Sequence, residues 1–350
     1  MRLFGTLLFG VVIFCITFLI YVYPVTAIAH LLTGSAIVSD TGLWVSLAIA
    51  GLILFYFRTH ASSALLSGLT YFGMGFGFIG FLVTSLGLAI AQFIPHASFP
   101  IGLICLFMFA IISFIAAANG TKVQIKQVQI SSDKISTDRH FAFISDVHIG
   151  SNQPAHLAKL CQHINQLEHE AVLIGGDLFD SSAFQTADVA ALRTLEKPIY
   201  FVTGNHEFYV RDHATKIASL GEFGVQNIDN QTADLGEINL IGIGDRQSGA
   251  KQADVAQSAV KDDKFNLILV HQPGLWGKQP ASTDFMISGH THNGQIFPFN
   301  FLVRLQFNAV YGLYRHGNTQ LYVSSGSGTW GPRLRLGTAN EIIHLTIKAA

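Results

Sequence analysis

Hydrophobic residues follow two contrasting patterns along the chain. The first 118 residues are almost wholly apolar, and their only Lys, Arg, Asp or Glu side chains are Arg2, Asp40 and Arg58. After Gly120, short apolar runs alternate with polar segments. Because a helix needs about 20 apolar residues to cross a bilayer, the two parts predict different structures: a membrane part and a part of ordinary soluble composition.

The apolar part contains four stretches long enough to span a membrane. We place the spans at residues 3–23, 41–57, 71–93 and 99–118. Pro24, Pro95 and Pro100 lie at the expected helix ends, where the missing proline N–H is tolerated. The sequence therefore predicts a transmembrane domain of about four helices over residues 1–118 and a second domain over residues 119–350.

Basic residues are distributed unevenly among the loops that these spans would create. One side carries Arg2, Arg58, Lys122 and Lys126, whereas the opposite loops, residues 24–40 and 94–98, contain no Lys or Arg. The positive-inside rule then predicts a multi-pass inner or plasma membrane protein whose second domain is cytoplasmic. If residues 3–23 were instead a signal peptide cleaved after residues 27–29, three spans would leave that domain on the same side.

The pattern after Gly120 is typical of an α/β domain. Residues 122–130 alternate with period two and predict a half-exposed strand. Residues 154–168 carry apolar side chains at helical spacing, and His156, His163 and His169, which flank this helix, are expected to be solvated. Alternating strands and helices indicate a layered α/β fold.

Polar clusters directly follow the predicted strands of this domain. The residues that could bind metal are Asp146, His148, Asp177, Asn205, His271, His290 and His292, and His206 lies beside them in the chain. In open α/β sheets, ligands gather at the carboxyl ends of strands. Carboxylate, amide and imidazole ligands in this number exceed one tetrahedral site and suit two borderline metal ions.

These clusters occur in an ordered set of motifs that resembles the calcineurin-like metallophosphoesterase family. The motifs are DVH (146–148), GGDLFD (175–180), GNHE (204–207), VHQP (270–273) and GHTHNGQ (289–295). The segment SSGSGTWGPRLRLGTANEI (324–342) is similar to the end of the membrane-associated, YkuE- and YaeI-like branch of that family. The resemblance covers residues from about 122 to 350 and implies a four-layer α-β-β-α sandwich.

The resemblance also implies a role for each of these residues. One ion would be held by Asp146, His148 and His292, the other by Asn205, His271 and His290, with Asp177 bridging both. Asn205 and His206 would contact the substrate, and His206 would protonate the leaving oxygen, oriented by Asp180. The ions would be Mn, Fe or Zn, divalent or trivalent. Asn293 stands where the family usually has glycine, which leaves the shape of this loop open.

We therefore expect a membrane-anchored phosphoesterase. It would hydrolyse a phosphodiester, pyrophosphate or phosphomonoester by attack of a metal-bridging hydroxide. Its partners would be the lipid bilayer and a phosphorylated small molecule, with a lipid-linked substrate favoured because four spans exceed what tethering requires. The alternatives are a nucleotide phosphodiesterase with a soluble substrate and a membrane sensor whose domain binds without turnover.

Two further features limit these expectations. The charges of the second part nearly balance, without the basic stripe that nucleic-acid binding requires. The aromatic stretch 297–314 is interpreted either as a core hairpin or as an apolar lip facing the membrane, with Arg304 and Arg315 near headgroup phosphates. Oligomeric state is not predicted: Gly73 and Gly77 in the third span permit close helix contact, either within the anchor or between copies.

Overall fold

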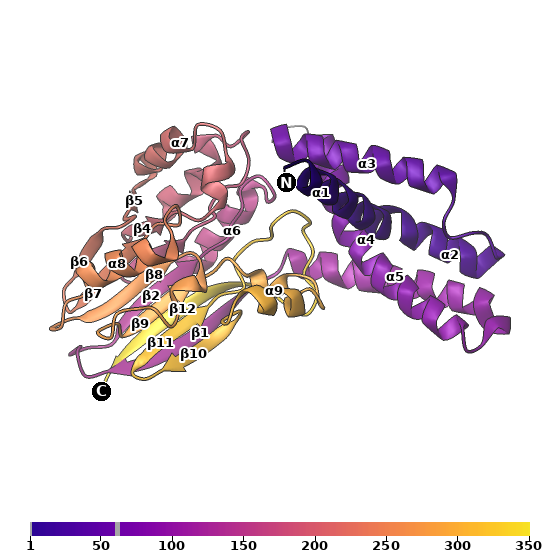
Figure 1. The fold of residues 1–350 in the computed structure, drawn as a ribbon. Helices are drawn as coiled ribbons and strands as arrows, with labels where there is room; N and C mark the ends of the chain where they lie inside the picture. The colour runs from indigo at the N-terminus through magenta and orange to yellow at the C-terminus, as the bar shows by residue number, and fades with distance from the viewer. Residues whose placement is uncertain (1, 60–63) are drawn as a thin grey trace. The chain divides into compact units, whose positions relative to one another are not determined.

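The computed structural model describes residues 2–59 and 64–350 of the chain. The chain divides into two compact units, residues 1–118 and 119–350 (Figure 1). Because the positions of the two units relative to one another are not determined, each is described by itself.

The first unit is built from helices. They are α1 (Arg2–Thr17), α2 (Tyr23–Thr33), α3 (Asp40–Thr59), α4 (Ala64–Ala91) and α5 (Ser98–Gly120). Among the described residues, four stretches are long and apolar enough to cross a membrane: Leu8–Thr33, Asp40–Arg58, Leu65–Ala91 and Pro95–Gly120. The four predicted spans thus correspond to helices, although most of the helices are longer than predicted.

The largest difference lies at the end of the first predicted span. We expected the helix to end before Pro24, but a π-helical turn, Phe18–Val22, connects α1 directly to α2. Pro24 then occupies the first turn of α2, where the absent N–H is tolerated. The helix continues to Thr33 and is ended by Gly34, whose φ of 74° is easily adopted only by glycine.

Gly73 and Gly77 of α4 allow close packing inside this unit. A Cβ atom at Gly73 would lie 2.1 Å from the ring of Tyr21, and one at Gly77 would lie 2.0 Å from the carbonyl oxygen of Ile20. The structure therefore supports the interpretation in which this glycine pair packs helices within the anchor.

The second unit contains two six-stranded sheets. The first has the strand order β1 (Val123–Ser132), β12 (Asn340–Ala349), β2 (Arg139–Ile144), β3 (Ala171–Gly175), β4 (Ile199–Val202) and β5 (Val225–Asn227). The second has the order β10 (Gly312–His316), β11 (Thr319–Val323), β9 (Phe285–Ser288), β8 (Phe265–Val270), β7 (Ile238–Ile243) and β6 (Thr232–Leu235). Strands β2 to β5 are parallel to one another, as are β7, β8, β9 and β11.

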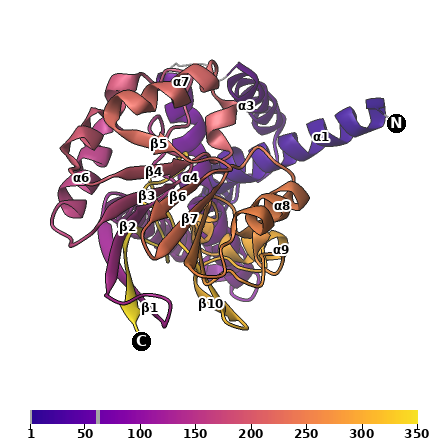
Figure 2. The ribbon, with the colours of Figure 1, turned by 90° about the vertical axis from the view of Figure 1, so that its left-hand side faces the viewer.

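Side chains that alternate along the strands build three cores between four layers. In β2, Ala142 and Ile144 pack against α6 (Pro154–Ile164), while Phe141 and Phe143 face the other sheet. The outer face of the second sheet packs against α8 (Gly249–Ala259). Figure 2 shows α6 and α8 on opposite sides of the strands. The predicted four-layer α-β-β-α sandwich is confirmed.

Two local predictions need correction. The helix expected over residues 154–168 ends at Ile164. His156, expected to be solvated on this helix, is only partly exposed, and its Nε2 lies 2.7 Å from the carbonyl oxygen of Ser327. The imidazole is drawn inward because the loop carrying Ser327 covers this side of α6, which the helix pattern alone cannot reveal.

The aromatic stretch 297–314 is not a simple core hairpin. Its end pairs as a strand, with β10 antiparallel to β11. Its beginning forms a short helix, α9 (Asn300–Gln306), in which Phe301, Leu302 and Leu305 are exposed.

Candidate metal centre

The predicted metal ligands lie in the loops that follow parallel strands of both sheets. Asp146 and His148 follow β2, Asp177 follows β3, and Asn205 follows β4. From the second sheet, His271 follows β8, and His290 and His292 follow β9. The carboxyl ends of these strands therefore bring together side chains separated by up to about 150 positions in the chain.

Most of these residues have an unusual backbone conformation. Those with positive φ are Asp146, His148, Asp177, His290 and His292. Non-glycine residues rarely adopt this region, and such conformations concentrate at functional sites because the surrounding structure must stabilise them. The fold thus maintains strained loops at the point where the ligands converge.

Two glycines let the loops approach one another closely enough. A Cβ atom at Gly204 would lie 2.2 Å from Oδ1 of Asp177, and one at Gly289 would lie 2.2 Å from Oδ2 of Asp146. Any side chain at either position would displace a carboxylate of the centre.

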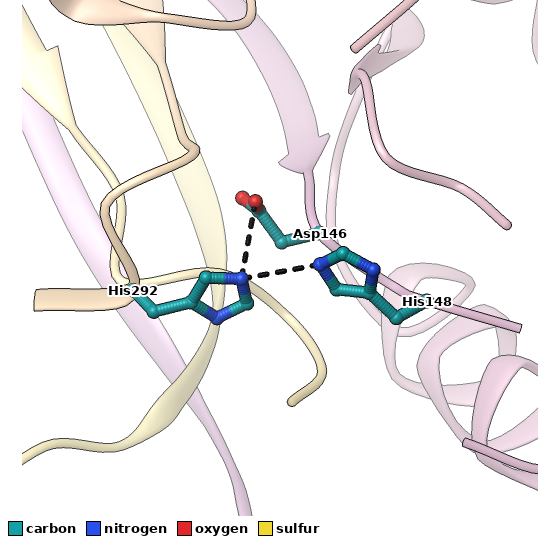
Figure 3. Close-up of side chains that lie close together, drawn as sticks. All are labelled: Asp146, His148 and His292. Atoms are coloured by element: carbon teal, nitrogen blue, oxygen red, sulfur yellow. Dashed lines mark hydrogen bonds and ion pairs between the residues drawn. The ribbon is translucent and has the colours of Figure 1, made fainter. Parts of the chain in front are cut away.

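One group of ligand atoms is formed by Asp146, His148 and His292. Nε2 of His292 lies 3.1 Å from Nε2 of His148 and 3.4 Å from Oδ1 of Asp146. Figure 3 shows that the two rings and the carboxylate point toward a common centre, although they come from separate segments of the chain. All three residues are buried.

A second group is formed by Asp177, His271 and His290, with Asn205 beside it. Nε2 of His271 lies 3.2 Å from each of Asp177 Oδ2, Asn205 Oδ1 and His290 Nδ1. The same Oδ2 of Asp177 lies 3.7 Å from Nε2 of His148 in the first group. Asp177 therefore lies between the two groups, as a bridging ligand must.

Contacts behind the rings, one with a backbone carbonyl and one with a carboxylate, direct two of the imidazoles toward the centre. Nδ1 of His271 lies 2.8 Å from the carbonyl oxygen of Gly175 and donates to it, so Nε2 faces the centre with its lone pair. Nδ1 of His148 lies 3.3 Å from Oδ2 of Asp180, which likewise leaves Nε2 for the centre. Both arrangements are typical of metal-bound histidines.

The role expected for Asp180 is corrected by this geometry. Asp180 was predicted to orient His206, but its carboxylate pairs with His148 and accepts from the hydroxyl of Ser151 at 2.5 Å. The aspartate follows β3 on the side of the β2 loop, so its short side chain reaches the first ligand group. Although burial alone would raise it, the pKa of Asp180 is lowered because His148 and Ser151 stabilise the carboxylate.

The chemistry of these atoms fits two cations. Carboxylate oxygens, an amide oxygen and imidazole nitrogens face one another in a buried space, and within each of three groups the ligand atoms lie within 4.8 Å of one another. Although burial opposes charge, the neighbouring histidines lower the pKa of Asp177, and Asp177 in turn raises the pKa of His271. Converging electron-pair donors of these types are stabilised by bound metal ions. The residues therefore fit a dinuclear metal site.

His206 lies at the partly open side of the centre. Its side chain is 17% exposed, and its Nε2 lies 4.0 Å from Oδ2 of Asp177. Its ring contacts those of His148, Tyr209 and Trp330. Burial lowers the pKa of His206 to about 4, which keeps the imidazole neutral at pH 7. The ring is therefore placed to contact a substrate that enters beside Asp177.

Sequence reasoning missed two buried charged residues that support the centre. Glu207 accepts from the backbone N–H groups of Asp177, Leu178, Phe179 and Gly204 at 2.7–3.2 Å. Arg335 is fully buried and donates to the carbonyl oxygens of His292, Ser325 and Gly328. Their signal was present in the motifs, because Glu207 ends GNHE and Arg335 lies between Leu334 and Leu336 in the segment 324–342.

Asn293 adopts a backbone conformation that is also open to glycine. Asn293 has φ 50° and ψ 33°, the left-handed conformation that glycine adopts freely and asparagine tolerates better than most residues. The next residue, Gly294, cannot be replaced in the same way, since its Cβ would lie 2.3 Å from the nitrogen of Asn300.

Comparison with known proteins gives the same class as the site. The family model for calcineurin-like phosphoesterases matches residues 139–294. An uncharacterized metallophosphoesterase of Campylobacter jejuni is 34% identical over 261 residues, which cover 71% of this chain and 70% of that protein. The chain therefore belongs to the calcineurin-like phosphoesterase family.

Other relatives are matched over part of their length. A metallophosphoesterase of Helicobacter pylori is 36% identical over 238 residues, and the alignment covers 64% of each chain. A Bos taurus protein named "Transmembrane protein with metallophosphoesterase domain" is 32% identical over 234 residues, 59% of this chain and 52% of that protein. Together with the four apolar helices, this relative indicates a membrane protein.

Solved structures with distant similarity include a dimetal phosphatase from Danio rerio. It is 12% identical, has a TM-score of 0.33, and is aligned over 55% of this chain and 88% of its own. A phosphopantetheinyl hydrolase from Mycobacterium tuberculosis also has 12% identity and a TM-score of 0.33, over 57% of this chain and 92% of its own.

Proposed function

We propose that this protein is a membrane-anchored phosphoesterase that uses two metal ions to hydrolyse a phosphodiester, pyrophosphate or phosphomonoester bond of a lipid-linked substrate. The observation that carries the proposal is the position of Asp177, whose Oδ2 faces His271 of one ligand group and His148 of the other. A shared carboxylate of this kind places two ions close enough to act on one phosphoryl group.

Each side of the centre has a defined task in this proposal. Asp146, His148 and His292 would hold one ion, and Asn205, His271 and His290 the other, with Asp177 shared. Ions bound there would supply Lewis acidity and generate a nucleophile from water. Asp180 and the carbonyl of Gly175 fix the imidazoles of His148 and His271 so that their Nε2 atoms face inward.

His206 would contact the phosphoryl group or the leaving oxygen. Its partly exposed ring lies beside Asp177 and is held between His148, Tyr209 and Trp330. A backbone hydrogen bond of 2.8 Å from its N–H to Asp177 Oδ1 keeps the loop in place. An imidazole fixed by such contacts can donate a hydrogen bond to phosphate without reorganising.

Two observations support a lipid-linked substrate. The first unit contains four apolar helices, which is more than a simple tether requires. Aromatic rings also lie beside the metal centre: Phe307 contacts His290 at a centroid distance of 5.2 Å, and Trp330 contacts His206 at 5.6 Å. Such rings favour a substrate with an apolar part over a wholly polar one.

The proposed orientation places the catalytic unit on the cytoplasmic side. It rests on Arg2, Arg58, Lys122 and Lys126, which fall on one side of the four spans, while the opposite loops carry no Lys or Arg.

The proposal is tested with full-length protein loaded in turn with Mn, Fe and Zn. Wild type, Asp177→Asn and the exposed control Asp263→Asn are compared on bis(p-nitrophenyl) phosphate and on phosphatidyl-p-nitrophenol presented in nanodiscs. We expect turnover of both probes by wild type and the control, with loss in Asp177→Asn. Metal-loaded wild type that turns over neither probe would favour a sensor, and turnover of the soluble ester alone would favour a soluble substrate.

A further inference from the structure

An exposed apolar surface surrounds α9 in the second unit. We call it the α9 surface and define it by Phe297, Phe299, Phe301, Leu302 and Leu305. Their side chains are 50%, 46%, 57%, 56% and 84% exposed, respectively. Phe301 and Leu305 are one helical turn apart, with Leu302 beside them, so they share one face of α9. Grouped exposed side chains of this size mark interaction sites.

The α9 surface lies close to the point where the second unit is joined to α5. A Cβ atom at Gly120, the last residue of α5, would lie 2.3 Å from the carbonyl oxygen of Arg333. Three residues further on, the carbonyl of Leu336 accepts a 2.9 Å hydrogen bond from the N–H of Phe297. The short segment 333–336 therefore connects the end of an apolar, membrane-length helix to the α9 surface.

The chain also limits how far this region can be from lipid. Only Thr121 and Lys122 separate α5 from β1. Two extended residues span about 7 Å. If α5 crosses the bilayer, the part of the second unit beside Gly120 stays near the headgroups.

Charge on this side of the unit suits an anionic lipid surface. No Asp or Glu occurs between Asp284 and Glu341, whereas Arg304 and Arg315 lie within and just after the α9 region and are exposed. In the part of the chain that the structure describes, no ion pair engages either arginine. A segment with exposed apolar side chains, arginines and no carboxylate residues is typical of segments that lie in a membrane interface.

The α9 surface adjoins the metal centre. Phe307, which follows α9, contacts the ring of His290. On the other side, Arg335 donates to the carbonyl oxygen of His292 at 2.8 Å. A lipid surface in contact with α9 would therefore lie beside the opening of the catalytic site.

We propose that the α9 surface docks on the phospholipid bilayer. Phe301, Leu302 and Leu305 insert among the upper acyl chains, while Arg304 and Arg315 pair with headgroup phosphates. Docking places the metal centre where a phosphate group at the membrane surface can reach it; this consequence, unlike docking itself, rests on the proposed lipid-linked substrate.

Docking is tested directly with a nitroxide at position 305. Full-length Cys15→Ser protein carries either Leu305→Cys or, as an exposed control on α8, Gln257→Cys; Cys105 and Cys161 are buried and remain. In nanodiscs of phosphatidylcholine and phosphatidylglycerol, we expect the label at 305 to be accessible to oxygen and protected from an aqueous nickel chelate, and the label at 257 to show the reverse. Equal chelate access at both positions would overturn docking. Dipolar broadening between labels at 305 would do so as well, by identifying a second copy as the occupant.

Kinetics separate docking from the proposed substrate. Phe301→Ser/Leu305→Ser is compared with Ile125→Ser, which replaces an exposed apolar side chain on β1. Burial of one Leu or Phe side chain changes a binding constant by about tenfold or more. We therefore expect the activity of the double variant on phosphatidyl-p-nitrophenol to fall by about tenfold or more, and its activity on bis(p-nitrophenyl) phosphate to be retained. Equal loss on both probes, or no loss on the lipid probe, would contradict docking. If wild type ignores the lipid probe while the label at 305 is protected, docking stands and the lipid-linked substrate fails.

Discussion

Nδ1 of His148 and Oδ2 of Asp180 lie 3.3 Å apart beneath the metal centre, and both side chains are almost wholly buried. The pair links a predicted metal ligand to a carboxylate that holds its ring. Because a histidine whose Nδ1 faces a carboxylate presents Nε2 to the metal, this contact determines how the first ligand group is arranged.

We predict that Asp180→Asn weakens the first ion more than the second. Loss of a carboxylate behind a metal-bound histidine typically lowers metal affinity by about 10–100-fold. Calorimetric titration of metal-free protein should show one weakened site and one nearly unchanged site. Asp263→Asn, which changes an exposed aspartate, serves as the control. Equal weakening of both sites would indicate a general loss of loop structure, and no change would remove Asp180 from the centre.

Much of the fold and of the ligand set could be predicted because both depend on local pattern. β2 and β8 are short buried runs; His271 follows β8 directly, and Asp146 lies two residues after the end of β2. The partner of Asp180 could not be predicted, since it depends on which neighbouring loop its side chain reaches after folding. The continuation of the first span through Pro24 was also hidden, because it depends on a single π-helical turn.

Arg335 is another residue whose contacts could not be predicted from the sequence. Its position between two leucines could be read from the sequence, but its partners are the carbonyl oxygens of His292 in one loop and of Ser325 and Gly328 in another. No side-chain pattern encodes the direction of backbone carbonyl groups. The hydrogen-bond partners of such a buried arginine can be identified only when the positions of the loops are known.

We predict that Arg335→Met destabilises the second unit and disturbs His292. The substitution keeps much of the side-chain volume but leaves several buried carbonyl oxygens without donors, which should cost about 3 kcal/mol or more. Thermal unfolding of metal-free protein should show the loss. Arg333→Met, two residues away and exposed, should unfold close to wild type. If Arg335→Met matched this control, the hydrogen bonds around His292 would be unimportant.

A third prediction concerns the pH dependence of stability at His156. Burial lowers the pKa of His156, although its Nε2 donates to the carbonyl oxygen of Ser327. With a folded pKa below the unfolded value of 6.5, the unfolded state binds the proton more readily. Stability is therefore lost as pH falls below that value.

His156→Gln should remove this loss while keeping an N–H donor for Ser327. The difference in melting temperature between the variant and wild type should shift in favour of the variant as pH falls from about 7.5 to about 5.5. His156→Phe, which lacks the donor, should be less stable than wild type at pH 7.5. A difference for His156→Gln that stays constant across this range would contradict the prediction.

The last prediction concerns metal removal. Metal ions that bind the folded centre and not the unfolded chain stabilise the folded state by mass action. Chelation should therefore lower the melting temperature. Re-addition of metal should restore the melting temperature. The free energy of unfolding should rise with the logarithm of the metal concentration, by about 4 kcal/mol at 1,000 times the dissociation constant. In Asp177→Asn the shared ligand loses its charge, so the metal-dependent increase in melting temperature should shrink. An increase equal to that of wild type would show that the ions bind elsewhere, because no other described residue connects the two ligand groups in the way that Asp177 does.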